Sequence, residues 1–285
     1  MANSHQNQFK LLPRTWQKWL VENVERGCTI EGMCTVLTEE GGFLPELAIT
    51  AITEVLEQEK TLCPRPDIDT QKNIIQILEQ RIEITLTLDK PRIVVLRNVL
   101  THEECDALVA LASQRQQRST VVGTSDGDLQ IHADRTSYGA TFQREENKLL
   151  SRIEARLACL CHWPADHGEG IQVLNYGLKD EYKPHFDSFD YETEDGKNNW
   201  EPGGQRMITV IAYLNDVEEG GETGFPELGI NIPPKKGDVV VFHNTLLNDA
   251  ATHPKINPRS LHGGMPVIKG EKWMVNLWFR ENLRY

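Results

Sequence analysis

The chain has 285 residues, of which 39% are hydrophobic and 25% are charged, so its composition allows a globular fold with a substantial core. The formal net charge of −12 argues against a dedicated nucleic-acid-binding protein, because such a protein needs a basic face to neutralise phosphates. No apolar run approaches the roughly 18 residues that a membrane span requires. The polar segment 1–10 also lacks the apolar stretch of a signal peptide, so we expect no membrane association and a cytoplasmic location.

The cysteines support a reducing compartment. They form no C-x-x-C pair, and their scatter predicts reduced, mostly buried thiols in place of disulfides or a zinc site. The six residues are Cys28, Cys34, Cys63, Cys105, Cys159 and Cys161.

The N-terminal part of the chain has helical spacing. Between residues 14 and 62 apolar side chains recur at three- and four-residue intervals, which predicts about three short helices. A further amphipathic helix is expected from Thr70 to about Glu83. We therefore predict a small all-α region over residues 1–88, which serves substrate docking or dimerisation. Trp16 and Trp19 are expected to form a core pair, with a dimer contact or a substrate groove as the alternatives.

The pattern changes after residue 90 to short β-branched runs. A capping box at Thr101–Glu104 predicts a helix over 105–114, and a second helix is expected over 145–161. Short strands separated by Gly, Pro and Asn turns are typical of a β-barrel or jelly roll. They are expected at residues 93–96, 171–176, 207–214, 229–232, 238–243, 261–267 and 272–280.

One short motif suggests a metal site. Asp187 follows His185 by two positions, so on a strand both side chains point to the same face. An H-x-D pair is common by chance, and its meaning depends on a third ligand. We place that ligand at His262, where small neighbouring residues leave space at a metal; His243 and His253 are its rivals. Two imidazoles and one carboxylate form the ligand set of non-heme Fe(II) oxygenases.

Lys272 lies at the start of the last expected strand. By default a lysine there is an exposed strand-edge residue. The alternative is a partly buried ammonium that binds the far carboxylate of a dicarboxylate cosubstrate. Tyr213 could add a hydroxyl donor, although the pattern alone favours a core position.

Several motifs, taken in order, resemble the prolyl 4-hydroxylase family of Fe(II)/2-oxoglutarate dioxygenases. The resemblance runs from about residue 91 to residue 280 and implies an α+β fold. That fold is a double-stranded β-helix (jelly roll) with flanking helices, forming a catalytic domain over residues 89–285. The motifs are Glu169–Tyr176, Tyr182–Asp187, Gly203–Arg206, Tyr213–Asn215, Gly220–Thr223, Leu261–Val267 and Gly270–Trp273.

The resemblance also implies roles for individual residues. Fe(II) is expected on His185, Asp187 and His262, and the C5 carboxylate of 2-oxoglutarate on Lys272. The cosubstrate pocket is expected to include Tyr176, Tyr213, Thr209 and Trp278. Substrate-side positions are Arg135, Ser137, Glu169, Arg206 and Arg280.

Two departures from the family pattern leave the substrate open. Arg280 stands where some peptide-acting relatives carry a histidine, and the acidic loop 188–202 is longer than usual. The resemblance implies hydroxylation of proline residues in a peptide or protein, with O2 consumed, ascorbate as reductant, and succinate and CO2 released. One alternative is a hydroxylase of a free amino acid, proline or a relative, whose charged groups could meet the acidic loop and Arg206 or Arg280. Another is a non-catalytic iron- or oxygen-sensing scaffold. The oligomeric state is open.

Overall fold

The computed structural model describes residues 9–25, 28–61, 66–118, 121–122, 129–130, 135–200, 203–246 and 254–283. The chain divides into two compact units, one of residues Met1–Pro64 with Leu246–Thr252 and the other of Arg65–Thr245 with His253–Tyr285. Among the described helices, none has the length and apolar character needed to cross a membrane.

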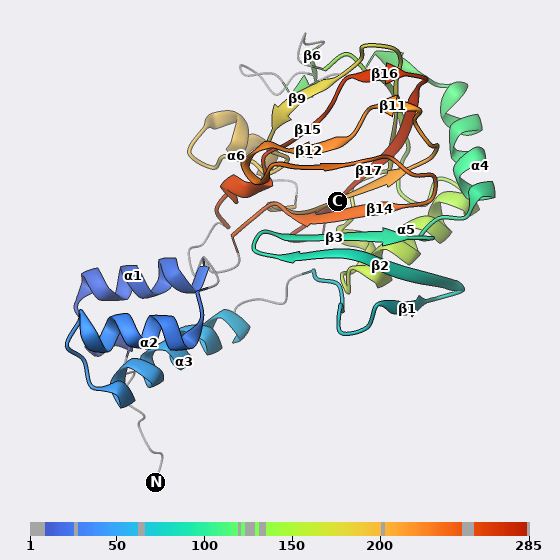
Figure 1. Cartoon of the computed structure of the whole chain (residues 1–285). Helices are drawn as coiled ribbons and strands as arrows, with labels where there is room; N and C mark the ends of the chain where they lie inside the picture. The colour runs from blue at the N-terminus through green and yellow to red at the C-terminus, as the bar shows by residue number, and fades with distance from the viewer. Residues whose placement is uncertain are drawn as a thin grey trace. The chain divides into compact units, whose positions relative to one another are not determined.

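The N-terminal unit is helical, as its spacing predicts (Figure 1). Its apolar faces meet in a core of their own, built around Leu20, Leu37 and Ile52. Trp16 and Trp19 pack against this core and lie edge to face with each other, with ring centroids 5.4 Å apart, which confirms the predicted core pair. The elements are η1 (Phe9–Leu11), α1 (Arg14–Glu25), α2 (Ile30–Glu39) and α3 (Pro45–Thr61).

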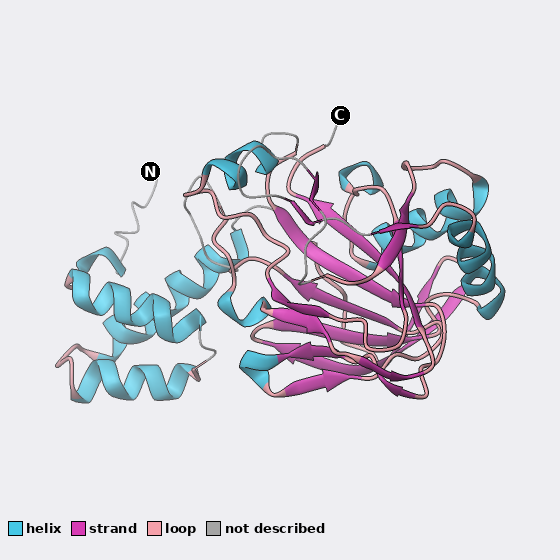
Figure 2. Ribbon diagram, turned by 90° about the horizontal axis from the view of Figure 1, so that it is seen from above, coloured by secondary structure: helices cyan, strands magenta, loops and turns pink. Residues whose placement is uncertain are grey.

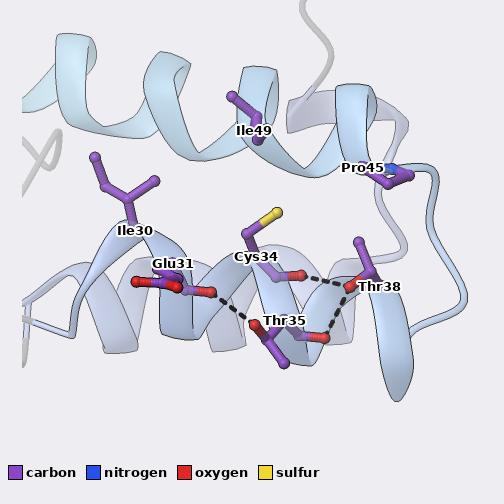
Figure 3. A pocket seen from close by; sticks show the side chains of 7 residues that line it. All are labelled: Ile30, Glu31, Cys34, Thr35, Thr38, Pro45 and Ile49. Atoms are coloured by element: carbon purple, nitrogen blue, oxygen red, sulfur yellow. Dashed lines mark hydrogen bonds between the residues drawn. The ribbon is translucent and has the colours of Figure 1, made fainter.

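A surface groove of about 480 Å³ lies between α2 and α3 (Figure 3). The hydroxyls of Thr35 and Thr38 donate to helix carbonyls at 2.9 Å, so these polar groups are satisfied within α2. Ile30 and Ile49 remain 51% and 49% exposed, so the groove presents apolar surface to solvent. Its lining residues are Ile30, Glu31, Cys34, Thr35, Thr38, Pro45 and Ile49.

The larger unit is built on two antiparallel sheets (Figures 1 and 2). The nine-stranded sheet runs from edge to edge as β1 (Ile74–Ile77), β2 (Gln80–Asp89), β3 (Arg92–Arg97), β14 (Val239–His243), β10 (Arg206–Tyr213), β17 (Lys272–Arg280), β8 (Gln172–Tyr176), β7 (Tyr138–Thr141) and β4 (Gln117–Arg118). The four-stranded sheet runs as β13 (Ile230–Ile232), β12 (Thr223–Phe225), β15 (His262–Gly264) and β9 (Tyr182–His185).

Shorter elements complete this unit. Two small ladders pair β11 (Glu219–Gly220) with β16 (Val267–Lys269), and β5 (Val121–Val122) with β6 (Leu129–Gln130). The helices are α4 (His102–Ser113), α5 (Lys148–Leu160), α6 (Glu194–Trp200), η2 (Ala165–His167), η3 (Pro226–Leu228) and η4 (Pro258–Ser260).

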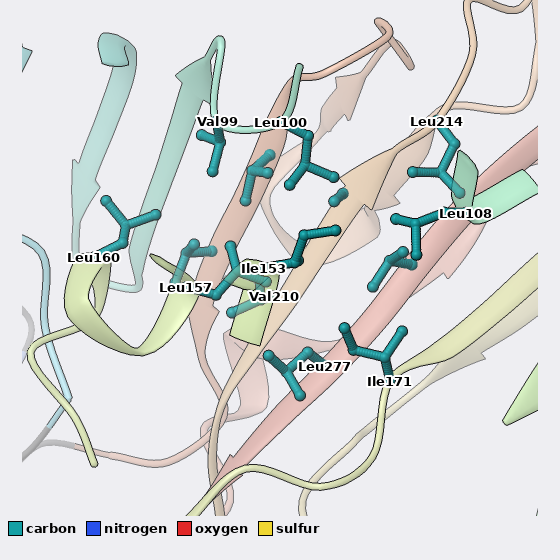
Figure 4. Close-up of a cluster of buried hydrophobic side chains, with 14 of the residues drawn as sticks. Val99, Leu100, Leu108, Ile153, Leu157, Leu160, Ile171, Val210, Leu214 and Leu277 are labelled. Atoms are coloured by element: carbon teal, nitrogen blue, oxygen red, sulfur yellow. The ribbon is translucent and has the colours of Figure 1, made fainter. Parts of the chain in front are cut away.

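The larger unit has two hydrophobic cores, an outer one under the helices and an inner one between the two sheets. The outer core joins α4 and α5 to one face of the nine-stranded sheet, with Leu108, Leu157, Val210 and Leu277 among its members (Figure 4). The inner core combines side chains from both sheets, such as Tyr213 of β10 and Phe225 of β12. Two layers of antiparallel strands closed over an inner core form the jelly roll expected from the sequence.

Strand alternation decides what enters the space between the sheets. All nine residues of β17 are buried, because both faces of this strand are covered. Trp273, Val275, Leu277 and Phe279 belong to the outer core. Since successive side chains point to opposite faces, the polar residues at positions 272, 276 and 280 share the inner face with Met274 and Trp278.

Several sequence predictions are confirmed in this unit. Helix α4 begins at the predicted capping box, in which the Thr101 side chain accepts from the Glu104 amide and the Glu104 side chain accepts from the Thr101 amide. Helix α5 follows Asn147, whose side chain accepts from two amides of the first turn. The cysteines within the described ranges are all free, although only Cys105 and Cys161 are buried.

The predicted helix from Thr70 to Glu83 is wrong, and so is the domain boundary near residue 88. Residues 74–77 and 80–89 form the hairpin of β1 and β2, with Leu78 at a φ of 49° in the turn. The isoleucines in this segment recur at helical intervals, but they are β-branched, and pairing of β2 with β3 favours the strand. The two compact units therefore divide at Pro64/Arg65.

A buried ion pair fastens α4 to α5. Glu104 and Arg156 are 4% and 1% exposed, and two charge-assisted bonds of 2.6 and 3.0 Å join them. We expect Glu104→Gln to lower the free energy of unfolding by about 1.5–3 kcal/mol, because it removes the buried carboxylate of the pair and leaves the half-exposed Glu79 as the remaining carboxylate partner of Arg156. Urea unfolding measures this loss. The exposed neighbour provides the control: Glu103→Gln should change stability much less than Glu104→Gln. Equal losses in the two variants would contradict the prediction.

Candidate metal centre

The three predicted ligands lie together in the larger unit. His185 ends β9, His262 begins β15, and the two residues are direct partners in the ladder, with ring centroids 4.5 Å apart. Asp187 Oδ1 lies 3.6 Å from His185 Nε2, and Asp187 Oδ2 lies 3.4 Å from His262 Nε2. Within the ranges that the structure describes, this is the one group of three such side chains able to share a metal ion, with ligand atoms all within 4.8 Å.

The backbone differs from the prediction at one point. We expected His185 and Asp187 on one strand, but β9 ends at His185 and the chain bends at Asp187. The sequence predicted that small residues beside His262 leave space at the metal. The structure gives Gly263, the next residue, a different role. A Cβ on Gly263 would lie 2.8 Å from the carbonyl oxygen of Tyr182, so the missing side chain allows β15 to approach β9.

Both imidazoles are oriented by backbone carbonyls. His185 Nδ1 lies 2.8 Å from Lys183 O, and His262 Nδ1 lies 2.9 Å from Ser260 O. A carbonyl oxygen can only accept, so in each ring Nδ1 donates and the neutral ring keeps its lone pair on Nε2. Burial lowers the pKa of His262 to about 4, so this imidazole is neutral at neutral pH, as metal ligation requires.

Asp187 is held as a carboxylate. Burial opposes its ionisation, but the imidazoles of His262 and His185 and the guanidinium of Arg206 keep its pKa well below the usual range. The Thr209 hydroxyl donates to Asp187 Oδ2 at 2.7 Å. Asn244 Nδ2 donates in turn to Thr209 Oγ1 at 2.9 Å. The structure thus places Thr209 against the carboxylate, and it adds Asn244, which no sequence motif had indicated.

Of the two rival histidines, the structure describes only His243, and it does not join this group. His243 Nε2 lies 3.8 Å from Asp67 Oδ1, in a separate cluster with Arg92. His253 lies outside the described residues.

Lys272 is a buried cation, so its default interpretation as an exposed strand-edge residue is wrong. It is 2% exposed, and its Nζ lies 5.5 and 5.6 Å from the ring centroids of Tyr176 and Tyr213. Burial lowers its pKa to about 7, against the opposing effect of Glu222. Among the described residues no carboxylate lies within 4.0 Å of its ammonium. A poorly solvated ammonium of this kind would be stabilised by an anionic ligand.

The two tyrosines beside Lys272 differ in their hydroxyl contacts. Tyr213 is fully buried, as its core pattern predicts, and its hydroxyl donates to Thr223 Oγ1 at 2.7 Å. Tyr176 is 3% exposed, and Ser137 and Arg135 both interact with its hydroxyl. Tyr176, expected in the cosubstrate pocket, thus contacts Ser137 and Arg135, which were expected on the substrate side.

Three predicted substrate-side residues form one ion cluster. Arg206 donates to both oxygens of Glu169 at 2.7 and 2.9 Å, and Arg280 donates to Glu169 Oε1 at 3.0 Å. The guanidinium carbon of Arg206 also lies 3.9 Å from the centroid of the Trp278 ring. Both guanidiniums are thus already bound to a carboxylate of the protein.

Tyr182 contacts both Arg135 and His185. Arg135 is 6% exposed, donates to Gln172 Oε1 at 2.8 Å and lies 5.0 Å from the Tyr182 ring centroid. Tyr182 stacks on His185 with centroids 3.6 Å apart. Sequence analysis had used Tyr182 only as part of a motif. Residues three apart on a regular strand point to opposite faces, and the two rings stack where the pairing of β9 with β15 has a register shift, so no local sequence signal marks this contact.

Comparisons with known proteins agree with this geometry. The family model described as 2OG-Fe(II) oxygenase superfamily matches residues 171–280. The chain is 39% identical over 208 residues to probable prolyl 4-hydroxylase 3 of Arabidopsis thaliana, a match that covers 66% of this chain and 69% of that protein. It is 39% identical over 209 residues to prolyl 4-hydroxylase 5 of the same plant, covering 67% of this chain and 68% of that protein.

A solved structure is similar as well. The viral collagen prolyl hydroxylase of Paramecium bursaria Chlorella virus-1, in complex with 2-oxoglutarate, superposes with a TM-score of 0.51 at 28% identity. That match covers 66% of this chain and 95% of the viral chain. The identity to these relatives and the match to the family model agree with the His-Asp-His group and the buried lysine. The chain therefore belongs to the prolyl 4-hydroxylase family of 2-oxoglutarate- and Fe(II)-dependent oxygenases.

Proposed function

We propose that this dioxygenase hydroxylates proline residues in a peptide or protein. The observation that carries the proposal is the combination of an oriented His-Asp-His group with a buried ammonium that lacks a carboxylate partner among the described residues. Curated relatives named prolyl 4-hydroxylases support the choice of proline. The viral relative, named a collagen prolyl hydroxylase, supports a polypeptide substrate.

The ion cluster disfavours the free-amino-acid alternative. A free amino acid needs an anchor for its carboxylate, and the sequence offered Arg206 and Arg280 for that purpose. Both guanidiniums are bound to Glu169, so a second carboxylate would have to displace the first one. A peptide has no carboxylate beside the reacting residue and avoids this competition.

The donor set suits the expected cofactors. His185, Asp187 and His262 would hold Fe(II) through two Nε2 atoms and a carboxylate. Lys272 would bind the C5 carboxylate of 2-oxoglutarate, with the rings of Tyr176 and Tyr213 near the ammonium. When bound, Fe(II) with 2-oxoglutarate and O2 supplies the oxidative decarboxylation to succinate and CO2 that is coupled to C–H hydroxylation.

The residues of the chain orient the three ligand side chains and shield one of them from water. Backbone carbonyls hold the two imidazoles, and Thr209 fixes the orientation of Asp187. Tyr182 covers one face of His185 and limits access of water to that ligand. We expect ascorbate to serve as reductant in assays.

The role of the helical unit is a separate proposal: it docks the protein that carries the target proline. The groove between α2 and α3 supports this proposal, because Ile30 and Ile49 present apolar surface there. Dimerisation through the same groove is the alternative.

The metal ligands can be tested against a rival histidine. We expect His262→Ala to lose Mn(II) binding and to lower succinate formation by about a hundredfold or more. The control is His243→Gln, which should retain both. Succinate and product mass are read with a proline-rich peptide and with free L-proline. A gain of one oxygen on the peptide supports the proposal; a gain on free L-proline alone, or loss of metal from His243→Gln, contradicts it.

Lys272 should make cosubstrate binding depend on pH. Its folded-state pKa of about 7 lies below the usual 10.5, so the ammonium is present at lower pH and is lost as pH rises through 7. The KM for 2-oxoglutarate should therefore rise by about tenfold per pH unit above neutrality. Lys272→Arg stays charged, so its KM, even if higher, should be nearly independent of pH. The same slope in both proteins would assign the titration to another group.

The docking proposal predicts a difference between large and small substrates. We expect Ile49→Glu to raise the KM for a protein substrate by about tenfold, because the charge disrupts the apolar groove, and to leave the KM for a short peptide unchanged. Leu44→Glu is the matched control, since Leu44 is 74% exposed in the same unit but does not line the groove. A change in oligomeric state of the Ile49 variant, measured by light scattering, would instead favour dimerisation.

A further inference from the structure

Arg280, the last residue of β17, has contacts in two directions. It is 2% exposed. Its Nη1 donates to Glu169, while its Nη2 donates to Asn199 O at 2.6 Å and lies 3.4 Å from Trp200 O. Asn199 and Trp200 are the last residues of α6. One guanidinium therefore joins the ion cluster to the C-terminal carbonyls of a helix.

Helix α6 needs contacts of this kind. It has seven residues, and a helix so short is unstable by itself in water. Its last carbonyls have no partners within the helix, and a cation at this end complements the helix dipole. Arg280 provides both the donor and the charge.

The other side of the cluster leads to the metal centre. Glu169 also holds Arg206, whose Nη1 lies 3.5 Å from the carbonyl oxygen of Asp187. Phe189 packs against both guanidiniums, with its ring centroid 5.0 Å from Arg206 Cζ and 4.8 Å from Arg280 Cζ. The Gln205 side chain forms two hydrogen bonds of 2.8 Å with the backbone of Phe189. Its Nε2 donates to Phe189 O, and its Oε1 accepts from the Phe189 amide. Contiguous contacts thus connect Asp187 with α6.

The charges explain why arginine suits this position. Two guanidiniums face one carboxylate, and the carbonyls at the end of α6 supply the remaining negative potential. The planar fork of Arg280 serves both partners at once, which a single lysine ammonium cannot do. Loss of Arg280 still leaves Glu169 and Arg206 as a matched pair, so the substitution does not strand a buried charge.

We propose that Arg280 is a positioning residue that fixes α6 as one wall of the substrate site without binding iron or 2-oxoglutarate. The segment that carries α6 runs from Asp187 to Arg206. These two residues are in contact, so both ends of the segment lie beside the metal centre. Fixing α6 therefore sets the affinity for the polypeptide substrate. This inference rests on the proposed function, and one arm of its test is independent of turnover.

The test uses Arg280→Met and Arg280→Lys in the full chain. We expect both to raise the KM for a proline-containing peptide by about tenfold. The value of kcat, the Mn(II) affinity and the peptide-free formation of succinate should stay within about twofold of the parent. The conservative lysine should fail to rescue, because it cannot bridge Glu169 and the end of α6.

Limited proteolysis supplies the independent readout. Lys197, in α6, is the one trypsin site between Asp187 and Arg206. Its cleavage should accelerate about tenfold in both variants, since release of α6 exposes it to local unfolding. The control is Arg97→Met, which removes an exposed arginine of β3 and should change neither KM nor cleavage at Lys197.

Three results would overturn the proposal. One is unchanged cleavage at Lys197 in both variants. Another is faster cleavage without a rise in KM. The third is a loss of Mn(II) affinity equal to the rise in KM, which would indicate general damage to the fold. If the parent enzyme turns over only free amino acids, the proposed function fails, while the cleavage of Lys197 still reports whether Arg280 holds α6.

Discussion

The buried carboxylate of Asp187 is the group on which the rest of the site depends. A carboxylate in this environment loses hydration, and it stays ionised only because cationic and hydrogen-bonding groups surround it. Thr209 and Asn244 fix its orientation from the nine-stranded sheet, while the two histidines reach it from the four-stranded sheet. The metal centre is thus assembled between the two layers and requires both to be in register.

Hydrogen bonds and ion pairs explain how polar side chains are accommodated between the two sheets. Several of the polar side chains have defined partners: Asp187 has Thr209, Glu169 has two arginines, and the Tyr213 hydroxyl has Thr223. Lys272 is different, since its ammonium faces two aromatic rings and a distant carboxylate. Buried polar groups that lack a full set of partners are where ligands contribute most.

Sequence reasoning was most successful where chemistry and spacing coincided. The order of His185, Asp187, His262 and Lys272 identified residues that the structure brings into one region, and helical periodicity located the three N-terminal helices. It failed at residues 70–83, where isoleucines at helical intervals pair instead in a hairpin, because strand pairing is a tertiary effect that local periodicity cannot report.

Contacts between distant residues were equally beyond reach of the sequence. Motif matching assigned Thr209 to the cosubstrate pocket and Arg280 to the substrate, while their observed partners are Asp187 and the end of α6. Both contacts depend on how separate strands and a helix are packed, and neither has a local signature. The burial of Lys272 is similar, since it follows from coverage of both faces of β17.

The alternation along β17 has a consequence for how this site can change. Lys272 stands at one end of its inner face and Arg280 at the other, about 26 Å apart for a strand of this length. A slip of one residue would turn every one of these side chains outward together, so the strand must keep its alignment as a whole. With the roles proposed for Arg280 and Lys272, substitutions at the far end would alter substrate preference and leave the cosubstrate end intact. The length of β17 thus keeps the residue proposed to bind the cosubstrate apart from the residue proposed to position the substrate site.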